Sequence, residues 1–356
     1  MSCPVSRKYP LRQPKNYRPP IPRWQLKLPT DVARVYTIYV GVQKHISNAT
    51  TDAAATKAKN LLLEWLSDVH PEAHETFTVL EGDDEVGSEI WVCYFVDAAA
   101  YENSVRKLSL SQIQASLTPD GATIGLWCER FSTAVSRLET NYSGLDYLPG
   151  YAKIAGAETV EHTYSAYWGA ARDRIPDSGH DLFSKAPEHD TAPPQSVPSS
   201  VGRRLVGTSY ENMVHIRSGQ FWENCNAEEA EAYEIKLEPA LMTGLRYLWG
   251  NPLDTGTLGL RFVRNDGQSC RVARETCAAG FFRSLGDLEA WAEKHPSHKA
   301  IYLGAIKHAK TFGVERKMRT WHEVSVLKAG EARFEYVNCV PKTGVIRFVR
   351  LDEEAI

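Results

Sequence analysis

The apolar positions of this chain follow two periods that alternate along the sequence. In the first half, "RVYTIYVGVQ" from Arg34, "ETFTVLEG", "EIWVCYFVD" and "TIGLWCERFS" are rich in β-branched and aromatic residues, which predicts strands. Between them, "TTDAAATKAKNLLLEWLSDV" and "DAAAYENSVRKL" carry apolar residues at helical spacing behind Thr or Asp residues that can cap a helix. The first half therefore has the order strand, helix, strand, strand, helix, strand.

The second half repeats this order. Strands are predicted in "RRLVGTSYENMVHIRSG", "GTLGLRFVRN", "CRVARETC", "MRTWHEVSVL" and "RFEYVNCV". Helices are predicted in "NAEEAEAYEIKLEPALMTGLRYLWG", whose acidic first turn suits the helix dipole, in "SLGDLEAWAEKH" and in "HPSHKAIYLGAIKHAKTF". We expect an α+β fold of two ferredoxin-like halves, in which helices cover one side of antiparallel sheets.

Proline-rich segments suggest how the chain is divided. Residues 1–30 carry seven prolines and are expected to form an extended N-terminal arm. Residues 176–202 are rich in Pro, Ser and Asp and predict a long exposed connector. The two ferredoxin-like halves would then span residues 31–175 and 203–356.

Composition narrows the classes of function. The net charge of -3 comes without a basic, aromatic-interleaved stretch, so no nucleic-acid partner is expected. No apolar run approaches the roughly 20 residues that span a bilayer, and the N-terminal residues have no secretory apolar region, so no membrane partner is expected either. The seven cysteines form no CxxC pair, which favours reduced thiols in a cytoplasmic protein and argues against a cysteine-held metal.

Two polar residues share strand faces with apolar ones. Because strand side chains alternate between faces, His322 in "RTWHEVSVLK" points the same way as Val324 and Val326. In "ENMVHIRSGQFW", Ser218 shares a face with Ile216 in the same manner. Taken singly, such a residue is usually a core group with a hydrogen-bond partner.

A second histidine, His298, opens the apolar stripe of a predicted helix. Pro296 suits the first helical turn, and Ile301, Tyr302 and further apolar residues follow His298 at helical spacing. Since an unsatisfied buried polar group costs about 1–3 kcal/mol, His298, His322 and Ser218 together favour a shared pocket. One neutral imidazole could bind the iron of a haem, and the other could carry out acid–base chemistry, although periodicity leaves open whether the two meet.

The remaining histidines are weaker candidates by position. His295 precedes the helix, and His308 lies off its main stripe. His162 lies in a loop-like stretch, as do His180 and His189. The pair in "DVHPEAHE" is broken by a proline and reads as a solvated turn rather than a metal site.

Several separate blocks resemble one family. "YWGAARDRIP", "HIRSGQFW", "WAEKHPSH", "WHEVSV" and "FEYVNCVPKTG" are together similar to the aldoxime dehydratases, in the family's order and from about Pro19 to Thr343. The resemblance implies a dimeric α+β barrel-like haem-binding fold built from two ferredoxin-like halves, and hence a homodimer. It also implies haem b, ferrous in the active state, and a lyase that dehydrates an aldoxime, R–CH=N–OH, to a nitrile and water.

The resemblance also implies roles for individual residues. His298 matches the proximal iron ligand, His322 the distal acid and base, and Ser218 the serine that binds the oxime hydroxyl. Arg174 matches the distal arginine, and Glu139 a family carboxylate. The segment between the two matched histidines is slightly longer than in bacterial relatives, which leaves His295 and His308 open as iron ligands.

Two other classes of function remain at this stage. One is another haem enzyme of similar fold, peroxidase-like or chlorite-dismutase-like, and the other is a haem sensor without catalysis. A residue that acts first as an acid and then as a base needs a pKa near the working pH. We therefore expect His322 to have such a pKa. Whether the aldoxime carries an alkyl or an aryl group does not follow from the sequence.

Overall fold

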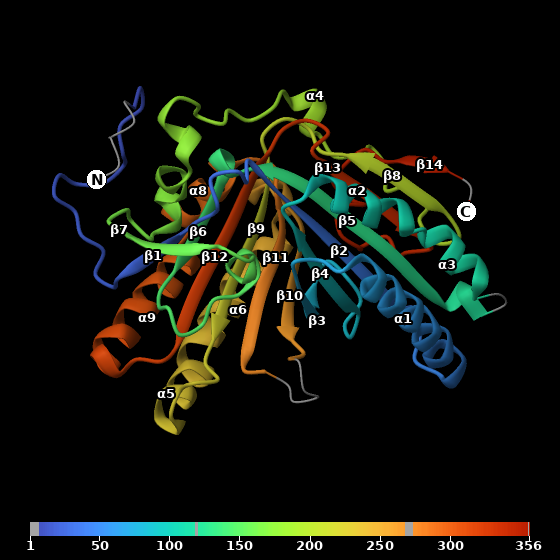
Figure 1. The fold of residues 1–356 in the computed structure, drawn as a ribbon, viewed down its shortest axis with the longest axis horizontal. Helices are drawn as coiled ribbons and strands as arrows, with labels where there is room; N and C mark the ends of the chain where they lie inside the picture. The colour runs from blue at the N-terminus through green and yellow to red at the C-terminus, as the bar shows by residue number, and fades with distance from the viewer. Residues whose placement is uncertain (1–6, 118–119, 268–272, 355) are drawn as a thin grey trace.

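A computed structural model describes residues 7–117, 120–267, 273–354 and 356 of the chain. In this part of the chain every strand belongs to one antiparallel sheet, flanked by two groups of helices (Figure 1). The strand order is β14-β8-β13-β5-β2-β4-β3-β10-β11-β9-β12-β6-β1-β7.

The strands and helices have the following bounds. The strands are β1 (Arg23–Lys27), β2 (Arg34–Lys44), β3 (Ala73–Gly82), β4 (Glu89–Phe95), β5 (Ile124–Ala134), β6 (Leu138–Tyr142), β7 (Glu158–His162), β8 (Arg204–Thr208), β9 (Met213–Phe221), β10 (Thr257–Asn265), β11 (Glu275–Phe282), β12 (Arg319–Leu327), β13 (Ala332–Val337) and β14 (Asp352–Glu354). The α-helices are α1 (Ala49–Val69), α2 (Ala98–Lys107), α3 (Leu110–Ser116), α4 (Glu188–Thr191), α5 (Ala227–Ala232), α6 (Glu238–Gly250), α7 (Pro252–Thr255), α8 (Leu285–Lys294) and α9 (Pro296–Phe312). Short 3₁₀ helices are η1 (Asp120–Thr123), η2 (Val135–Arg137), η3 (Gly150–Lys153), η4 (Trp168–Arg174), η5 (Pro176–Gly179) and η7 (Gly313–Glu315). The segment η6 (Tyr233–Leu237) is a short π-helix that joins α5 to α6.

The predicted strands and helices are confirmed, with the exception of one segment. Of the strand predicted in "CRVARETC", the residues from Glu275 form the start of β11, whereas residues 270–272 lie outside the described part of the chain. Caps follow the expected chemistry, since Asn48 accepts from the Thr51 N–H at the start of α1 and Asp97 from the Ala100 N–H at the start of α2.

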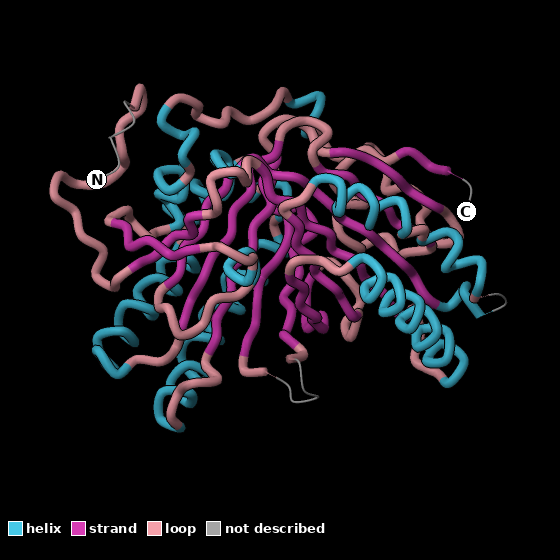
Figure 2. The backbone as a smooth tube through the Cα atoms, in the orientation of Figure 1, coloured by secondary structure: helices cyan, strands magenta, loops and turns pink. Residues whose placement is uncertain are grey.

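Two blocks of four strands form the centre of the sheet and share one order. Numbered along the chain within each block, both β5-β2-β4-β3 and β12-β9-β11-β10 read fourth, first, third, second. The blocks join where β3 pairs with β10. The outer face of the first block carries α1, α2 and α3, while α6, α8 and α9 cover the second block on the other side of the molecule (Figures 1 and 2).

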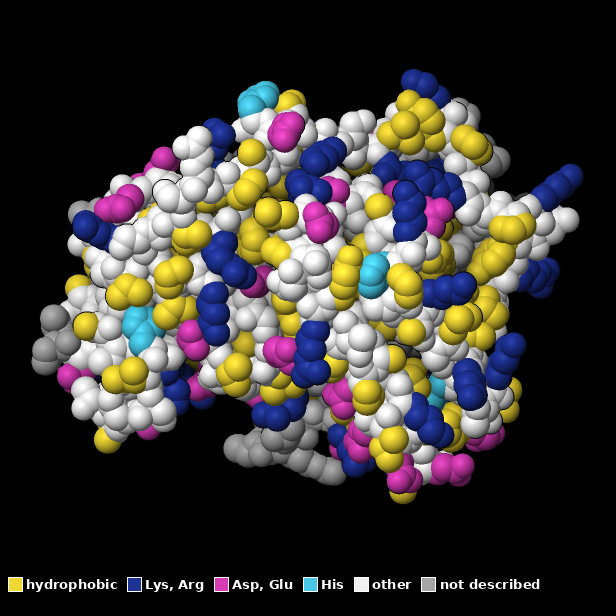
Figure 3. Space-filling model, turned by 180° about the vertical axis from the view of Figure 1, so that it is seen from behind, with side chains coloured by type: hydrophobic (Ala, Val, Ile, Leu, Met, Phe, Trp, Pro, Cys, Tyr) yellow, Lys and Arg dark blue, Asp and Glu magenta, His cyan; other side chains and the backbone are white. Residues whose placement is uncertain are grey.

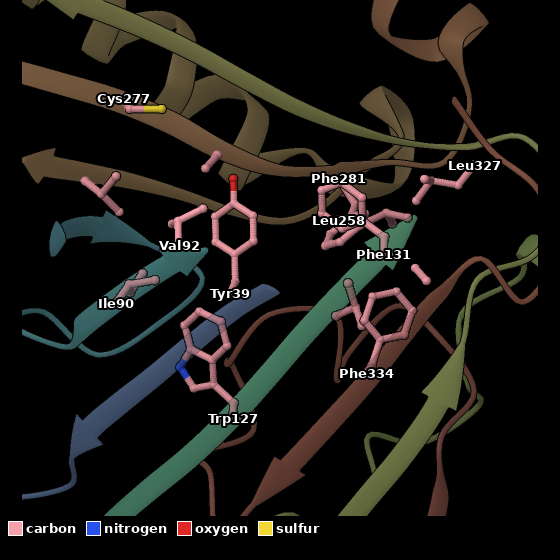
Figure 4. Close-up of a cluster of buried hydrophobic side chains, with 14 of the residues drawn as sticks. Tyr39, Ile90, Val92, Trp127, Phe131, Leu258, Cys277, Phe281, Leu327 and Phe334 are labelled. Carbon is pink, nitrogen blue, oxygen red and sulfur yellow. The ribbon is translucent and has the colours of Figure 1, made fainter. Parts of the chain in front are cut away.

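The inner faces of the two blocks pack against each other. Figure 4 shows Trp127 and Phe131 of the first block facing Leu258, Phe281 and Leu327 of the second. The sheet therefore curls around the largest apolar core of the described residues. It is not a closed barrel, because β5 pairs with β13 and β12 pairs with β6, which leaves β14 and β7 as the two ends.

Charged side chains also lie buried between the blocks. Arg217 contacts Glu75 and Glu323, and Arg261 pairs with Glu129 at 2.8 Å through both terminal nitrogens. Arg217–Glu75 and Arg261–Glu129 connect strands from opposite halves of the chain, whereas Arg217–Glu323 joins two strands of the second half. A buried pair stabilises mainly by avoiding the much larger cost of an unpaired buried charge.

The same glycine–tryptophan contact occurs in both blocks. Gly41 in β2 lies opposite Trp127 in β5, and Gly219 in β9 lies opposite Trp321 in β12. A Cβ atom at Gly41 would lie 2.1 Å from the Trp127 ring, and one at Gly219 would lie 2.0 Å from the Trp321 ring. Only glycine leaves room for the indole at either place.

The N-terminal arm and the connector are more ordered than we expected. Residues Arg23–Lys27 form β1, which pairs with β7 along its whole length and with β6 through Trp24 and Tyr142. The connector is not fully exposed, because Phe183 is buried beneath the guanidinium of Arg137. The connector also contains the short helix α4 (Glu188–Thr191), and the proline content did not reveal these features.

The outer surface carries mixed charge. On the face shown in Figure 3, acidic, basic and apolar side chains are interspersed. Among the residues that the structure describes, no helix is both long and apolar enough to cross a membrane.

Candidate active site

A cavity lies between the second block of strands and its helices. Its walls come from β9, β11 and β12 on one side and from α6, α8 and α9 on the other. Most of the lining is apolar, namely Ile21, Ile216, Leu237, Leu241, Leu245, Leu248, Leu260, Ala278, Leu288, Ile301, Ala305 and Ile306. A few polar groups on an apolar wall are typical of a site for a sizeable ligand.

His298 reaches this cavity from the first turn of α9. The helix begins after His295, with Pro296 in its first turn as predicted. The Nδ1 atom of His298 lies 2.9 Å from the carbonyl oxygen of Ala292, to which it can donate. This leaves Nε2 without a proton, and burial lowers the pKa of His298 to about 4. A neutral imidazole whose other nitrogen is held by a carbonyl is the usual form of a metal-ligating histidine.

His322 and Ser218 line the opposite wall as cross-strand partners. They lie directly opposite each other in β12 and β9, a position in which side chains on one face are in contact range. The His322 ring centroid is 4.3 Å from that of Trp168, and its Nδ1 has no hydrogen-bond partner among the described residues. The cavity thus brings together the three residues that the sequence singled out.

The protonation of His322 differs from our expectation. Burial, followed by the nearby cations Arg174 and Arg23, holds the pKa of His322 well below its usual value of 6.5. The expected pKa near the working pH is therefore wrong for this arrangement, and the neutral imidazole is the favoured form. The strand alternation predicted the face on which His322 lies, but it did not reveal the nearby cations Arg174 and Arg23.

Arg174 and Glu139 form an ion pair that does not line the cavity, although Arg174 is close enough to affect the pKa of His322. Nε of Arg174 lies 2.5 Å from Oε1 of Glu139, and neither side chain is exposed. Arg174 also donates to the carbonyl oxygens of Ser165 and Tyr167. Burial raises the pKa of Glu139, and Arg174 opposes that shift. One nitrogen of Arg174 and one oxygen of Glu139 keep no partner in the described chain.

The alternative ligands His295 and His308 point elsewhere. Nδ1 of His295 lies 2.7 Å from the Ser297 hydroxyl, and the ring stacks on Tyr247 at 3.6 Å. His308 lies beside Phe312 and does not line the cavity. Of the three candidates on or next to α9, His298 alone faces His322.

Sequence reasoning missed three polar residues near this cavity. Asn141 in β6 lies directly opposite His322, and its side-chain oxygen is buried without a partner in the described residues. Arg23 in β1 lines the cavity. His162, expected in a loop, ends β7 opposite Arg23, where burial lowers its pKa to about 4. For Arg23 the usable signal was the strict alternation of polar and apolar residues in "RWQLKL", which is typical of a strand.

Comparisons with known proteins identify the family of this chain. The model of the haem-containing dehydratase family matches residues 38–345. The aliphatic aldoxime dehydratase of Pseudomonas chlororaphis is 32% identical over 352 residues, covering 98% of this chain and 96% of that protein. The phenylacetaldoxime dehydratase of Bacillus sp. (strain OxB-1) is 29% identical over 344 residues, covering 96% of this chain and 95% of that protein.

Solved structures show the same relationship. The aldoxime dehydratase OxdRE in complex with butyraldoxime matches with a TM-score of 0.81 and 28% identity, covering 97% of this chain and 94% of that one. A second aldoxime dehydratase structure also has a TM-score of 0.81, at 30% identity, covering 97% of this chain and 96% of that one. Since the family match spans most of the sequence and the similarity extends over nearly its whole length, the chain belongs to the haem-containing dehydratases.

Proposed function

We propose that this protein dehydrates aldoximes to nitriles and water with haem b as its cofactor. The observation that carries the proposal is one apolar cavity faced by His298 on α9 and by His322 and Ser218 on the sheet. The relatives named above are aldoxime dehydratases, which agrees with this chemistry. The reaction makes the protein a lyase, and the apolar walls suit an aldoxime with an apolar substituent.

The residues present fit a haem. His298 would hold the iron through Nε2, because Nδ1 is occupied by the Ala292 carbonyl and the ring is neutral. The leucine side chains of α6 give an apolar wall for a porphyrin face. When bound, ferrous haem supplies Lewis-type activation of the oxime nitrogen, which weakens the N–O bond.

Ser218 and His322 would act on the oxime itself. The Ser218 hydroxyl donates to the oxime oxygen and orients it. The net reaction moves one proton from the oxime carbon to the departing hydroxyl, and the single imidazole of His322 can carry that proton. Because the neutral ring is favoured, the protonated state is short-lived. Arg174, held by Glu139, fixes the electrostatic setting of His322.

We further propose that the chain is a duplicated ferredoxin-like unit. The shared strand order and the repeated Gly–Trp contact support halves at residues 31–175 and 203–356, preceded by the arm and joined by the connector at residues 176–202. The homodimer and the cytoplasmic location remain predictions. Sedimentation of the purified protein tests the dimer, and a single species at monomer mass would contradict it.

The decisive experiment is anaerobic turnover. Purified protein is loaded with hemin, reduced with dithionite and given phenylacetaldoxime or butyraldoxime, and nitrile is measured. We expect nitrile from at least one substrate and a shift of the Soret band when aldoxime is added. Peroxide and chlorite turnover by the same sample, without nitrile, would assign it to another class of haem enzyme. A Soret shift without any turnover would indicate a sensor.

A further inference from the structure

One cation lines the cavity without an anionic partner. Arg23 comes from the N-terminal arm, and its main chain is fixed because β1 pairs with β7 and β6. Its guanidinium makes no hydrogen bond or ion pair with any residue that the structure describes, and its Nε is buried. The buried arginines Arg174, Arg217 and Arg261 differ from it, since each pairs with a buried glutamate.

The surroundings of Arg23 disfavour its positive charge. Burial, then Arg316 and Arg174, lower the pKa of Arg23 to about 9, so its charge is disfavoured by its neighbours but kept at neutral pH. Tyr17 and Tyr302 lie near enough to interact with it, but neither is a carboxylate. A half-buried guanidinium with a buried Nε and no carboxylate partner, close to further cations, is a site that an anionic group would stabilise.

The ligand proposed for this cavity carries such groups. Haem b bears two carboxylates at one edge of an otherwise apolar ring, and arginine is well suited to bind a carboxylate through two parallel hydrogen bonds. We propose that Arg23 of the N-terminal arm binds a carboxylate of the haem. This inference rests on the proposed function, and it makes the arm a part of the cofactor site rather than an appendage.

The test compares two forms of the cofactor. Apoprotein is titrated with hemin and with hemin dimethyl ester, which lacks the charged carboxylates, and binding is followed by the Soret band. We expect Arg23→Met to weaken hemin binding by about 10- to 100-fold, as for loss of a charge-assisted contact, and to leave the affinity for the ester unchanged. Arg23→Lys keeps the charge and should recover part of the loss.

Controls separate contact from general charge and from folding. Arg316→Met removes a nearby cation that does not line the cavity, and it should weaken hemin binding less than Arg23→Met does. Circular dichroism of each apoprotein checks that the fold persists. Equal weakening of hemin and of the ester by Arg23→Met, or no weakening of either, would overturn the assignment. Wild-type protein that binds hemin but forms no nitrile would refute the proposed function and leave the Arg23 contact standing.

Discussion

Ala278 in β11 occupies the place that Trp91 occupies in β4. Ala278 lies opposite Ser218, and Trp91 lies opposite Val40, the residue that precedes the glycine of the repeated Gly–Trp contact in the first block. Trp91 is buried under α1, whereas Ala278 lines the cavity. A small side chain at this position opens the space in one block, and a large one fills it in the other.

Replacing Ala278 by Trp should therefore close the cavity. We expect Ala278→Trp to abolish the Soret band on hemin titration, because the indole would fill the cavity. The far-ultraviolet circular dichroism should stay native, because the indole would not displace side chains of the apolar core. Ala278→Ser, which adds little volume, is the matched control and should bind hemin normally. Full hemin binding by the Trp variant would place the cofactor elsewhere.

Alanine variants of His298 and His322 should lose different properties, the first hemin affinity and the second turnover. We expect His298→Ala to lower hemin affinity at least tenfold, because it removes the proposed iron ligand. His322→Ala should keep hemin and lose about 10²- to 10⁴-fold in nitrile formation, the usual contribution of an acid–base group. Parallel hemin titrations and turnover measurements check both, with His308→Ala as a control outside the cavity. Loss of hemin in His322→Ala alone would reverse the assignment.

Removing the Ser218 hydroxyl should affect turnover more than cofactor content. Ser218→Ala deletes the donor to the oxime oxygen, and loss of one such donor typically lowers kcat by about 10²- to 10³-fold. Hemin stoichiometry should remain that of the wild type. An unchanged kcat in Ser218→Ala would contradict the proposed role of the Ser218 hydroxyl.

The buried Arg174–Glu139 pair should be sensitive to loss of one partner. Glu139→Gln leaves an unneutralised buried guanidinium, a change that typically costs about 3–5 kcal/mol of unfolding free energy. The double variant Arg174→Met with Glu139→Leu should be less destabilised than the single variant, since no buried charge remains. Urea unfolding of both variants measures the difference, and equal destabilisation would argue against a tightly coupled pair.

Stability should fall as the pH rises towards neutrality because of Glu323. Burial raises the pKa of Glu323 to about 7, although Arg217 lies 3.4 Å away, and the Tyr151 N–H donates to its other oxygen. In an unfolded chain a glutamate titrates near pH ~4.3, so the favourable contribution of the protonated form is complete below that pH and is lost as pH rises through about 7.

The matched variant is Glu323→Gln, which keeps an acceptor for the Tyr151 N–H. It should flatten the decline in unfolding free energy between pH ~4.5 and 7, a change on the order of a few kcal/mol. Thermal or urea unfolding across that range measures the slope. An unchanged slope would mean that other buried carboxyls, such as Glu275, whose pKa is also raised to about 7, dominate it.

Local pattern predicted much of this molecule. Strand alternation placed His322 and Ser218 on an apolar face, and helical spacing placed His298 on a stripe, and all three lie where those periods put them. What pattern lacked was pairing across the sheet. The register that sets Ser218 opposite His322, and Asn141 on its other side, depends on contacts between strands far apart in sequence.

The pKa of His322 and the presence of the cavity also could not be predicted from the sequence alone. The lowered pKa of His322 follows from burial and from Arg174 and Arg23, which come from a 3₁₀ helix and from an arm in which no strand was predicted. The cavity itself follows from the small side chain of Ala278, whose significance is visible only beside Trp91. Such features arise from the three-dimensional arrangement of distant segments.

The contact between Gly219 and Trp321 has a consequence for how this protein can change over time. Each residue adjoins a member of the Ser218–His322 pair, and the indole presses on the glycine from the opposite face of the sheet. A side chain at Gly219 would push the indole away and disturb the alignment of the two neighbouring strands. A substitution of Gly219 or of Trp321 during evolution would therefore require a compensating change in the other residue. The spacing of Ser218 and His322 thus depends on a contact on the opposite face of the sheet from the cavity.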